Sequence, residues 1–168
     1  MLRTLLPLLV CCALVTACGS GGDASSLCKD TFEPYRDLTI GQAPTERNRI
    51  FLDAMEHYRS GDFNGTADSL KVYVQQRDAQ ASARLYLACS YLALDRPYDA
   101  ELQLDKLEQS TTRQFKDQCA WYTVVCWVCS GQYPRALQGA REIAGSGRHT
   151  YTTEASNLIE ALRSIGVE

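Results

Sequence analysis

Signals for catalysis and metal binding are scarce in this sequence. It contains two histidines, His57 and His149, which leaves little material for histidine-based catalysis or for a zinc site. No G-x-S-x-G, H-E-x-x-H, Walker-type or G-x-G-x-x-G pattern occurs. We therefore predict no catalytic residue, no metal site and no cofactor, and we expect a protein that is not an enzyme.

Basic charge is also in short supply. The chain has 17 Lys and Arg against 20 Asp and Glu, a formal net charge of −3. Such a chain has no surplus of positive charge with which to neutralise a phosphate backbone, so nucleic acid is not an expected partner. The 45% of hydrophobic residues, the 5 prolines and the length of 168 residues are ordinary for one globular domain.

Long apolar runs are absent except near the N-terminus. The uncharged run from Leu5 to Val15 spans 11 residues, too few for a helix to cross a hydrocarbon core of ~30 Å. It follows Arg3 and ends in Val15-Thr16-Ala17-Cys18, which resembles a bacterial lipobox. The resemblance implies that residues 1–17 are a removed signal peptide and that Cys18 carries acyl chains such as palmitate. The alternatives are an ordinary secretory signal with an incidental cysteine, or an N-terminal membrane anchor.

The next segment, residues 18–44, is predicted to be a lipidated flexible tether followed by an extended strap. Gly and Ser dominate residues 19–26, as in a flexible linker. We call residues 28–44 the strap, which contains the stretch Phe32-Glu33-Pro34-Tyr35. From this N-terminal targeting signal we expect a lipid-anchored protein of the bacterial cell envelope, on either the inner or the outer membrane.

The remainder of the chain, residues 45–168, has the apolar periodicity of helices. Ala81, Leu85 and Ala88 lie three or four positions apart, whereas strand-like alternation is weak. Turn residues such as Gly61 and Gly131 separate the apolar stretches. We expect helices near 45–60, 64–77, 80–94, 97–109, 113–130, 133–145 and 151–163.

The expected helices form similar pairs that repeat about every 34 residues, a period typical of helix-turn-helix solenoids. An aromatic residue closes the first helix of each pair, another opens the second, and a small residue follows. The small residue lets the two helices approach closely, and the aromatics fill the space between neighbouring pairs. A generic bundle would not need this repetition. The closing aromatics are Tyr58, Tyr91 and Trp127, the opening ones are Phe63, Tyr98 and Tyr133, and the small residues are Ala67, Ala100 and Ala136.

This pattern resembles the tetratricopeptide repeat family over residues 45–145. The resemblance implies an all-α fold, a short right-handed helix-turn-helix solenoid of about three repeats, with residues 151–163 as a C-terminal capping helix. The layout, with a strap before three repeats, also resembles small tetratricopeptide lipoproteins of Bacteroidota. The tetratricopeptide resemblance rests on residues of all three repeats. In chain order these are Phe51, Tyr58, Gly61, Asp62, Phe63 and Leu70; Leu87, Ala88, Tyr91, Ala100, Leu104 and Leu107; and Val124, Trp127, Gly131, Tyr133, Ala136, Ala140 and Ile143.

In this family the first helix of each pair lines a concave groove, and the matching residues here are mostly apolar and aromatic. Exposed aromatics on a rigid surface are typical of protein-binding hot spots. Two alternatives stay open: the strap folds back and fills the groove, or Trp121 and Tyr122 belong to the core between helices. The predicted groove residues are Leu52, Arg59, Tyr86, Cys89, Leu92, Trp121, Tyr122, Val125 and Val128.

These observations favour a membrane-anchored adaptor or scaffold that binds an envelope or periplasmic protein or peptide through the groove. The alternative is a permanent structural subunit of a larger envelope assembly. A lipid- or glycan-binding module is a third interpretation.

Five cysteines follow Cys18. The Cys126-Trp127-Val128-Cys129 run falls in the last turns of an expected helix, whereas redox-active pairs normally use a helix N-terminus to lower the thiol pKa. Burial as small apolar residues is the simplest interpretation. An exported chain also permits disulfides, and a bridge from Cys89 to Cys126 or Cys129 across adjacent first helices is one candidate. The five are Cys28, Cys89, Cys119, Cys126 and Cys129, so at least one must stay free or pair between molecules.

Overall fold

The computed structural model describes residues 24–110 and 113–168, and these residues form eight α-helices and no strand. The expected signal peptide and the expected lipidation site, Cys18, lie outside the described residues. Within the described part of the chain, no helix has the length and apolar character needed to cross a membrane. The helices are α1 (Ala24–Thr31), α2 (Arg49–Arg59), α3 (Phe63–Tyr73), α4 (Ser82–Ala93), α5 (Pro97–Glu108), α6 (Lys116–Cys129), α7 (Tyr133–Gly145) and α8 (Thr152–Ser164).

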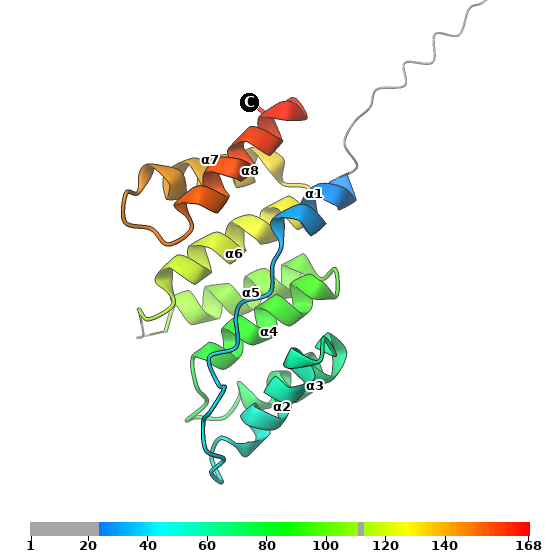
Figure 1. Ribbon diagram of the computed structural model, residues 1–168, viewed down its shortest axis with the longest axis vertical. Helices are drawn as coiled ribbons and strands as arrows, with labels where there is room; N and C mark the ends of the chain where they lie inside the picture. Colours follow the sequence, from blue (N-terminus) through cyan, green and yellow to red (C-terminus); the bar gives the residue numbers. More distant parts are fainter. Residues whose placement is uncertain (1–23, 111–112) are drawn as a thin grey trace, which may run out of the picture.

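From α2 onward the helices stack in chain order, each against the next (Figure 1). The pairs α2/α3, α4/α5 and α6/α7 lie one after another, and α8 packs on α7 at the end of the stack. This arrangement confirms the all-α helix-turn-helix solenoid that the 34-residue period predicts. Five of the seven expected helices are longer than the observed ones; the largest differences are at the start of α2, at Arg49, and at the end of α3, at Tyr73.

The turns within the three pairs share one backbone geometry. Three residues separate the helices in each pair, and the middle one has a positive φ: 77° at Gly61, 57° at Asp95 and 74° at Gly131. The residue after it donates its backbone N–H to a carbonyl five positions back, as from Arg96 to Tyr91 at 2.8 Å. This is the bonding that ends many helices on a left-handed residue. The three pairs are therefore structural repeats of one unit.

This turn geometry predicts opposite effects for two substitutions. Asp95→Gly should raise the free energy of unfolding by up to about 1 kcal/mol, because a residue with a Cβ is strained at positive φ. Gly131→Ala should lower it by about 1 kcal/mol for the same reason. Urea unfolding of both variants checks this prediction, and a loss of stability in Asp95→Gly would contradict it.

Small residues let the helices approach within each pair, as predicted. Ala67, Ala100 and Ala136 are all buried. The prediction for the opening aromatics is wrong at one position, because Tyr98 is 67% exposed. It is the second residue of α5, where its side chain lies outside the stack, whereas Phe63 packs against the core.

Helix α1 is a correction to the predicted flexible tether, since residues 24–31 are helical rather than extended. A helix of eight residues is marginal on its own. Here Leu27 packs against the core, and α1 contacts both α6 and α8. Tertiary contacts therefore stabilise a helix that the local sequence does not signal.

Candidate functional site

After α1 the chain crosses the stack along α6, α4 and α2 (Figure 1). We call residues 32–39, the part of the strap that does so, the crossing segment. Three tyrosine hydroxyls, one from each first helix, donate hydrogen bonds to its backbone carbonyls, and we call these three residues the tyrosine ladder. The bonds join Tyr122 to the carbonyl of Glu33 at 2.8 Å, Tyr58 to that of Tyr35 at 2.9 Å and Tyr86 to that of Arg36 at 3.1 Å.

Tyr86, the ladder tyrosine of the middle helical pair, both donates a hydrogen bond to the crossing segment and accepts one from it. The Tyr86 hydroxyl donates to Arg36 and also accepts the backbone N–H of Leu38 at 2.8 Å. The Tyr35 ring lies between two members of the ladder, with its centroid 6.1 Å from that of Tyr86 and 6.4 Å from that of Tyr122. Here the crossing segment is held through its main chain and the Tyr35 ring, and the Phe32 ring makes a further edge contact with Tyr122, with centroids 6.5 Å apart.

A covalent bond anchors the N-terminal end of the crossing segment. Cys28 of α1 and Cys129 at the end of α6 form a disulfide. The candidate bridge from Cys89 to Cys126 or Cys129 is therefore wrong, because α1 brings a different cysteine to the end of α6. Among the described residues Cys89, Cys119 and Cys126 are free and buried.

An ion pair anchors the other end. The Arg59 guanidinium lies 2.7 Å from the Asp37 carboxylate, which also accepts hydrogen bonds from the backbone N–H and the hydroxyl of Thr39. Burial alone would raise the pKa of Asp37, but the bonds from Thr39 and Arg59 outweigh it and hold the pKa below its usual 3.8. Stability from this carboxylate is therefore fully present above the pKa of the unfolded chain and is lost as the pH falls through the folded value.

The anchor gives a pH-dependent prediction. Asp37→Asn should lower the free energy of unfolding by about 1 kcal/mol near neutral pH, because it removes a charge-assisted acceptor with three donors. The deficit should shrink at about pH 2.5, where the wild-type carboxyl is protonated. Urea unfolding at the two pH values measures it. Asp68→Asn, which breaks an exposed pair with Lys71, is the control and should change little; an equal deficit at both pH values for Asp37→Asn would refute the assignment.

The predicted groove is therefore occupied by the chain's own strap, the first of the two alternatives. The second also holds, because Trp121 and Tyr122 belong to the buried core. Leu52 is half-buried and Arg59 is exposed but paired with Asp37. The other predicted members are buried and do not form an open surface: Tyr86, Cys89, Leu92, Trp121, Tyr122, Val125 and Val128.

Cys89 lies in the middle of the tyrosine ladder, under the crossing segment. It is fully buried. Burial raises the pKa of its thiol to about 11, although hydrogen bonds with the backbone of Tyr35 and the hydroxyls of Tyr58 and Tyr122 act in the opposite direction. Burial likewise raises the pKa values of the three ladder tyrosines, so their hydroxyls stay protonated and can donate.

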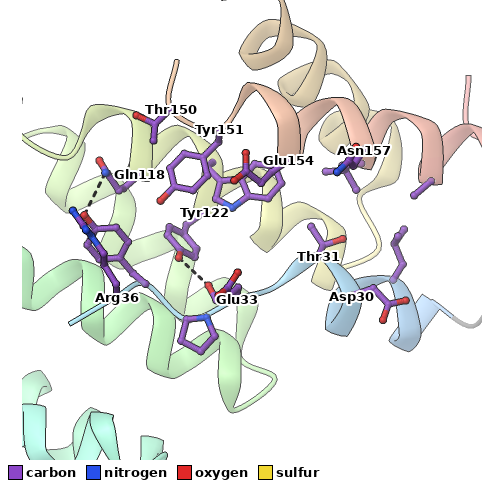
Figure 2. Close-up of a pocket in the computed structure, with 16 residues that line it drawn as sticks. Asp30, Thr31, Glu33, Arg36, Gln118, Tyr122, Thr150, Tyr151, Glu154 and Asn157 are labelled. Carbon is purple, nitrogen blue, oxygen red and sulfur yellow. Dashed lines mark hydrogen bonds between the residues drawn. The ribbon is translucent and has the colours of Figure 1, made fainter. Parts of the chain in front are cut away.

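One part of the concave side stays open (Figure 2). A pocket of about 590 Å³ lies between α1 and the crossing segment on one side and α8 on the other. The Trp121 and Tyr151 rings stack in its lining, with centroids 5.6 Å apart and an interplanar angle of 9°. Figure 2 shows Tyr122 between the crossing segment and α8, its hydroxyl bonded to Glu33.

Charges around the pocket are unequal. Asp30, Glu33 and Glu154 contribute three carboxylates and Arg36 one guanidinium. No ion pair joins any of these four groups to another described residue. The pocket therefore has an apolar, aromatic interior and an excess of negative charge at its edges.

A short loop before α8 shapes the far wall of the pocket. The Asp117 carboxylate at the start of α6 accepts hydrogen bonds from the backbone N–H and hydroxyl of Thr150, both at 2.8 Å. These bonds hold the pKa of Asp117 below its usual value. The His149 side chain lies between Asp117 and Tyr151 and is only 10% exposed.

Sequence reasoning missed this wall of the pocket. Apart from Gln118 of α6, its residues belong to the capping helix and the loop before it, which the repeat pattern assigns to no groove. The aromatic Tyr151 at the start of the last helix was the one signal available. The residues missed are Gln118, Thr150, Tyr151, Glu154, Asn157, Leu158 and Ala161.

Comparisons with known proteins identify no family for this chain. No protein-family model matches the chain, and neither a curated protein nor a solved structure does. Among the described residues, no three His, Cys, Asp or Glu side chains are grouped so that they could hold a metal ion. The fold and site define a helix-turn-helix solenoid whose concave side is partly filled by its own strap.

Proposed function

We propose that this protein is a non-enzymatic adaptor of the bacterial cell envelope that binds a segment of another envelope protein. The observation that carries the proposal is the open pocket beside the crossing segment, with its stacked Trp121 and Tyr151 rings. Tyr35 and Tyr151, which line the pocket and are only partly buried, provide aromatic contact area at low cost in conformational entropy. The tetratricopeptide resemblance and the lipobox at Cys18 support the same assignment.

The charges of the pocket indicate which segment would fit. Three carboxylates against one guanidinium favour a partner segment that carries basic side chains. An ammonium or guanidinium group over an aromatic face gains a further electrostatic attraction. We therefore expect a basic peptide segment between α8 and the crossing segment, with Glu154 and Glu33 beside its charged groups.

Site-specific photocrosslinking in intact host cells tests this function. A photoreactive residue at Asn157, in the pocket wall, should give an adduct with one envelope protein, identified by mass spectrometry of the crosslinked peptide. The same residue at Lys106, exposed on α5, should give none. Glu154→Gln should weaken the adduct, whereas Glu160→Gln, a change to an exposed acid of α8 outside the pocket, should not. Equal adducts from both positions, or none from either, would overturn the proposal.

A further inference from the structure

The crossing segment is bound in the way that a peptide ligand is bound. Every member of the tyrosine ladder contacts its main chain, and the contacts come from three successive helical pairs. Hydroxyl donors directed at carbonyls can recognise any extended chain, because each residue offers the same acceptor. The ladder therefore selects an extended backbone more than a particular sequence.

Apart from Asp37, which is anchored by Arg59, the side chains of the crossing segment contribute less to its binding than its main chain does. Glu33, Pro34 and Arg36 are exposed, and Leu38 is 38% exposed. Phe32 and Tyr35 are only partly buried, and Thr39 is the one residue of the segment that is fully enclosed. A segment that buries so little apolar surface can leave the groove at a lower cost than that of unfolding the helices beneath it.

We propose that the tyrosine ladder is a binding site for an extended main-chain segment of a partner protein, and that the crossing segment is its tethered competitor. The occupant it fits is an extended stretch of chain, since the ladder hydroxyls bond main-chain atoms of the crossing segment; a proline is tolerated there, as the exposed Pro34 shows. The disulfide of Cys28 and the ion pair of Asp37 keep the competitor at high local concentration. The apparent affinity for the partner is then the affinity of the open groove multiplied by the fraction of molecules in which the groove is open.

Two buried cysteines allow the departure of the crossing segment from the groove to be measured in the native protein. Cys89 lies under the crossing segment, whereas Cys126 is equally buried and has Glu101 and Asp105 of α5 among its charged neighbours. Opening of the crossing segment alone exposes Cys89, and only unfolding of the stack exposes both. Maleimide labelling of the native protein, followed residue by residue by mass spectrometry, should modify Cys89 at least about tenfold faster than Cys126.

A tyrosine variant links that opening to the ladder. Tyr122→Phe removes one hydroxyl and keeps the ring, so it should speed the labelling of Cys89 and leave that of Cys126 unchanged. Tyr98→Phe, which removes an exposed hydroxyl on α5, should alter neither rate. Equal labelling of Cys89 and Cys126 in every protein would overturn the inference, because the crossing segment would then be a fixed part of the fold.

Competition with an added peptide tests the occupant. The probe is a fluorescent peptide with the sequence of residues 32–39, which keeps its own aspartate. Asp37→Asn in the protein weakens the internal competitor, so the peptide should bind this variant about three- to tenfold more tightly than wild type. Arg59→Met removes the ion-pair partner from the internal competitor and from the probe alike, so it should leave the probe's affinity close to that of wild type. No saturable binding, equal affinity for Asp37→Asn and wild type, or a dimer in which two copies exchange crossing segments would overturn the proposal.

This inference goes beyond the pocket proposal and can fail separately from it. The labelling and peptide experiments report on the ladder and its competitor. The crosslinker at Asn157 reports on the wall formed by α8.

Discussion

Loss of the disulfide between Cys28 and Cys129 should lower the free energy of unfolding by about 2–4 kcal/mol. The bridge closes a long loop, since the two cysteines are 101 residues apart, and long loops lose the most entropy in the unfolded chain when they are closed. It also holds α1 against α6, and an eight-residue helix has little stability of its own. Equilibrium urea unfolding of the double variant Cys28→Ser, Cys129→Ser measures the loss.

The single variants provide the control for this prediction. Either single substitution breaks the same bond, so the cost of the double variant should be close to that of one single variant rather than to their sum. Near-UV circular dichroism should show that the remaining helices keep their packing. A loss below about 0.5 kcal/mol would mean that α1 and the crossing segment do not depend on the bridge.

A side chain at Gly139 should be the most damaging small change within the helical stack. A Cβ added there would lie 2.7 Å from Cγ2 of Val124 and 2.8 Å from Cζ3 of Trp127, closer than van der Waals contact allows. Gly139→Val should therefore lower the free energy of unfolding by about 2–4 kcal/mol, because α6 and α7 must separate. Thermal or urea unfolding monitored by circular dichroism measures this.

Two matched variants separate the steric effect from helix propensity. Gly145→Ala adds a Cβ at the end of the same helix, where it meets nothing within 4 Å, so it should be neutral or slightly stabilising. Val124→Ala combined with Gly139→Ala should cost less than the sum of the two single changes, because the smaller residue at 124 makes room. Strict additivity would show that the two helices are not in the close contact described.

The pairwise repeat was predictable because its signals are local. Gly61 and Gly131 mark turns that need a positive φ, and Ala100 and Ala136 mark positions where helices approach. These constraints act within about 35 residues of sequence, the range over which residue patterns are informative. The turn at Asp95 shows that the same geometry tolerates a non-glycine residue.

The disulfide and helix α1 were not predictable, because they depend on distant residues. Nothing near Cys28 indicates that its partner is Cys129 rather than another thiol. The sequence pattern also left two alternatives for the groove. Hydrogen bonds such as that between Tyr122 and Glu33 join residues 89 positions apart, and helical periodicity carries no information about contacts of that kind.

Two residues of the candidate site were identifiable, because their signal is the local repeat pattern. Trp121 and Tyr122 belong to a first helix, and the repeat pattern places them on the concave side. Tyr151 and Glu154 belong to the capping helix and its preceding loop, which join the site because α8 follows the stack and faces α1. The open pocket thus lies beside α8, the last helix of the described residues.

The account depends on the crossing segment lying in the concave groove in solution. The most direct measurement is a set of nuclear Overhauser contacts between aromatic rings in the native, oxidised protein. We predict contacts from the Tyr35 ring to the rings of Tyr86 and Tyr122, whose centroids lie 6.1 Å and 6.4 Å away. Absence of both contacts, with Tyr35 showing the narrow signals of a side chain in free solution, would contradict the account.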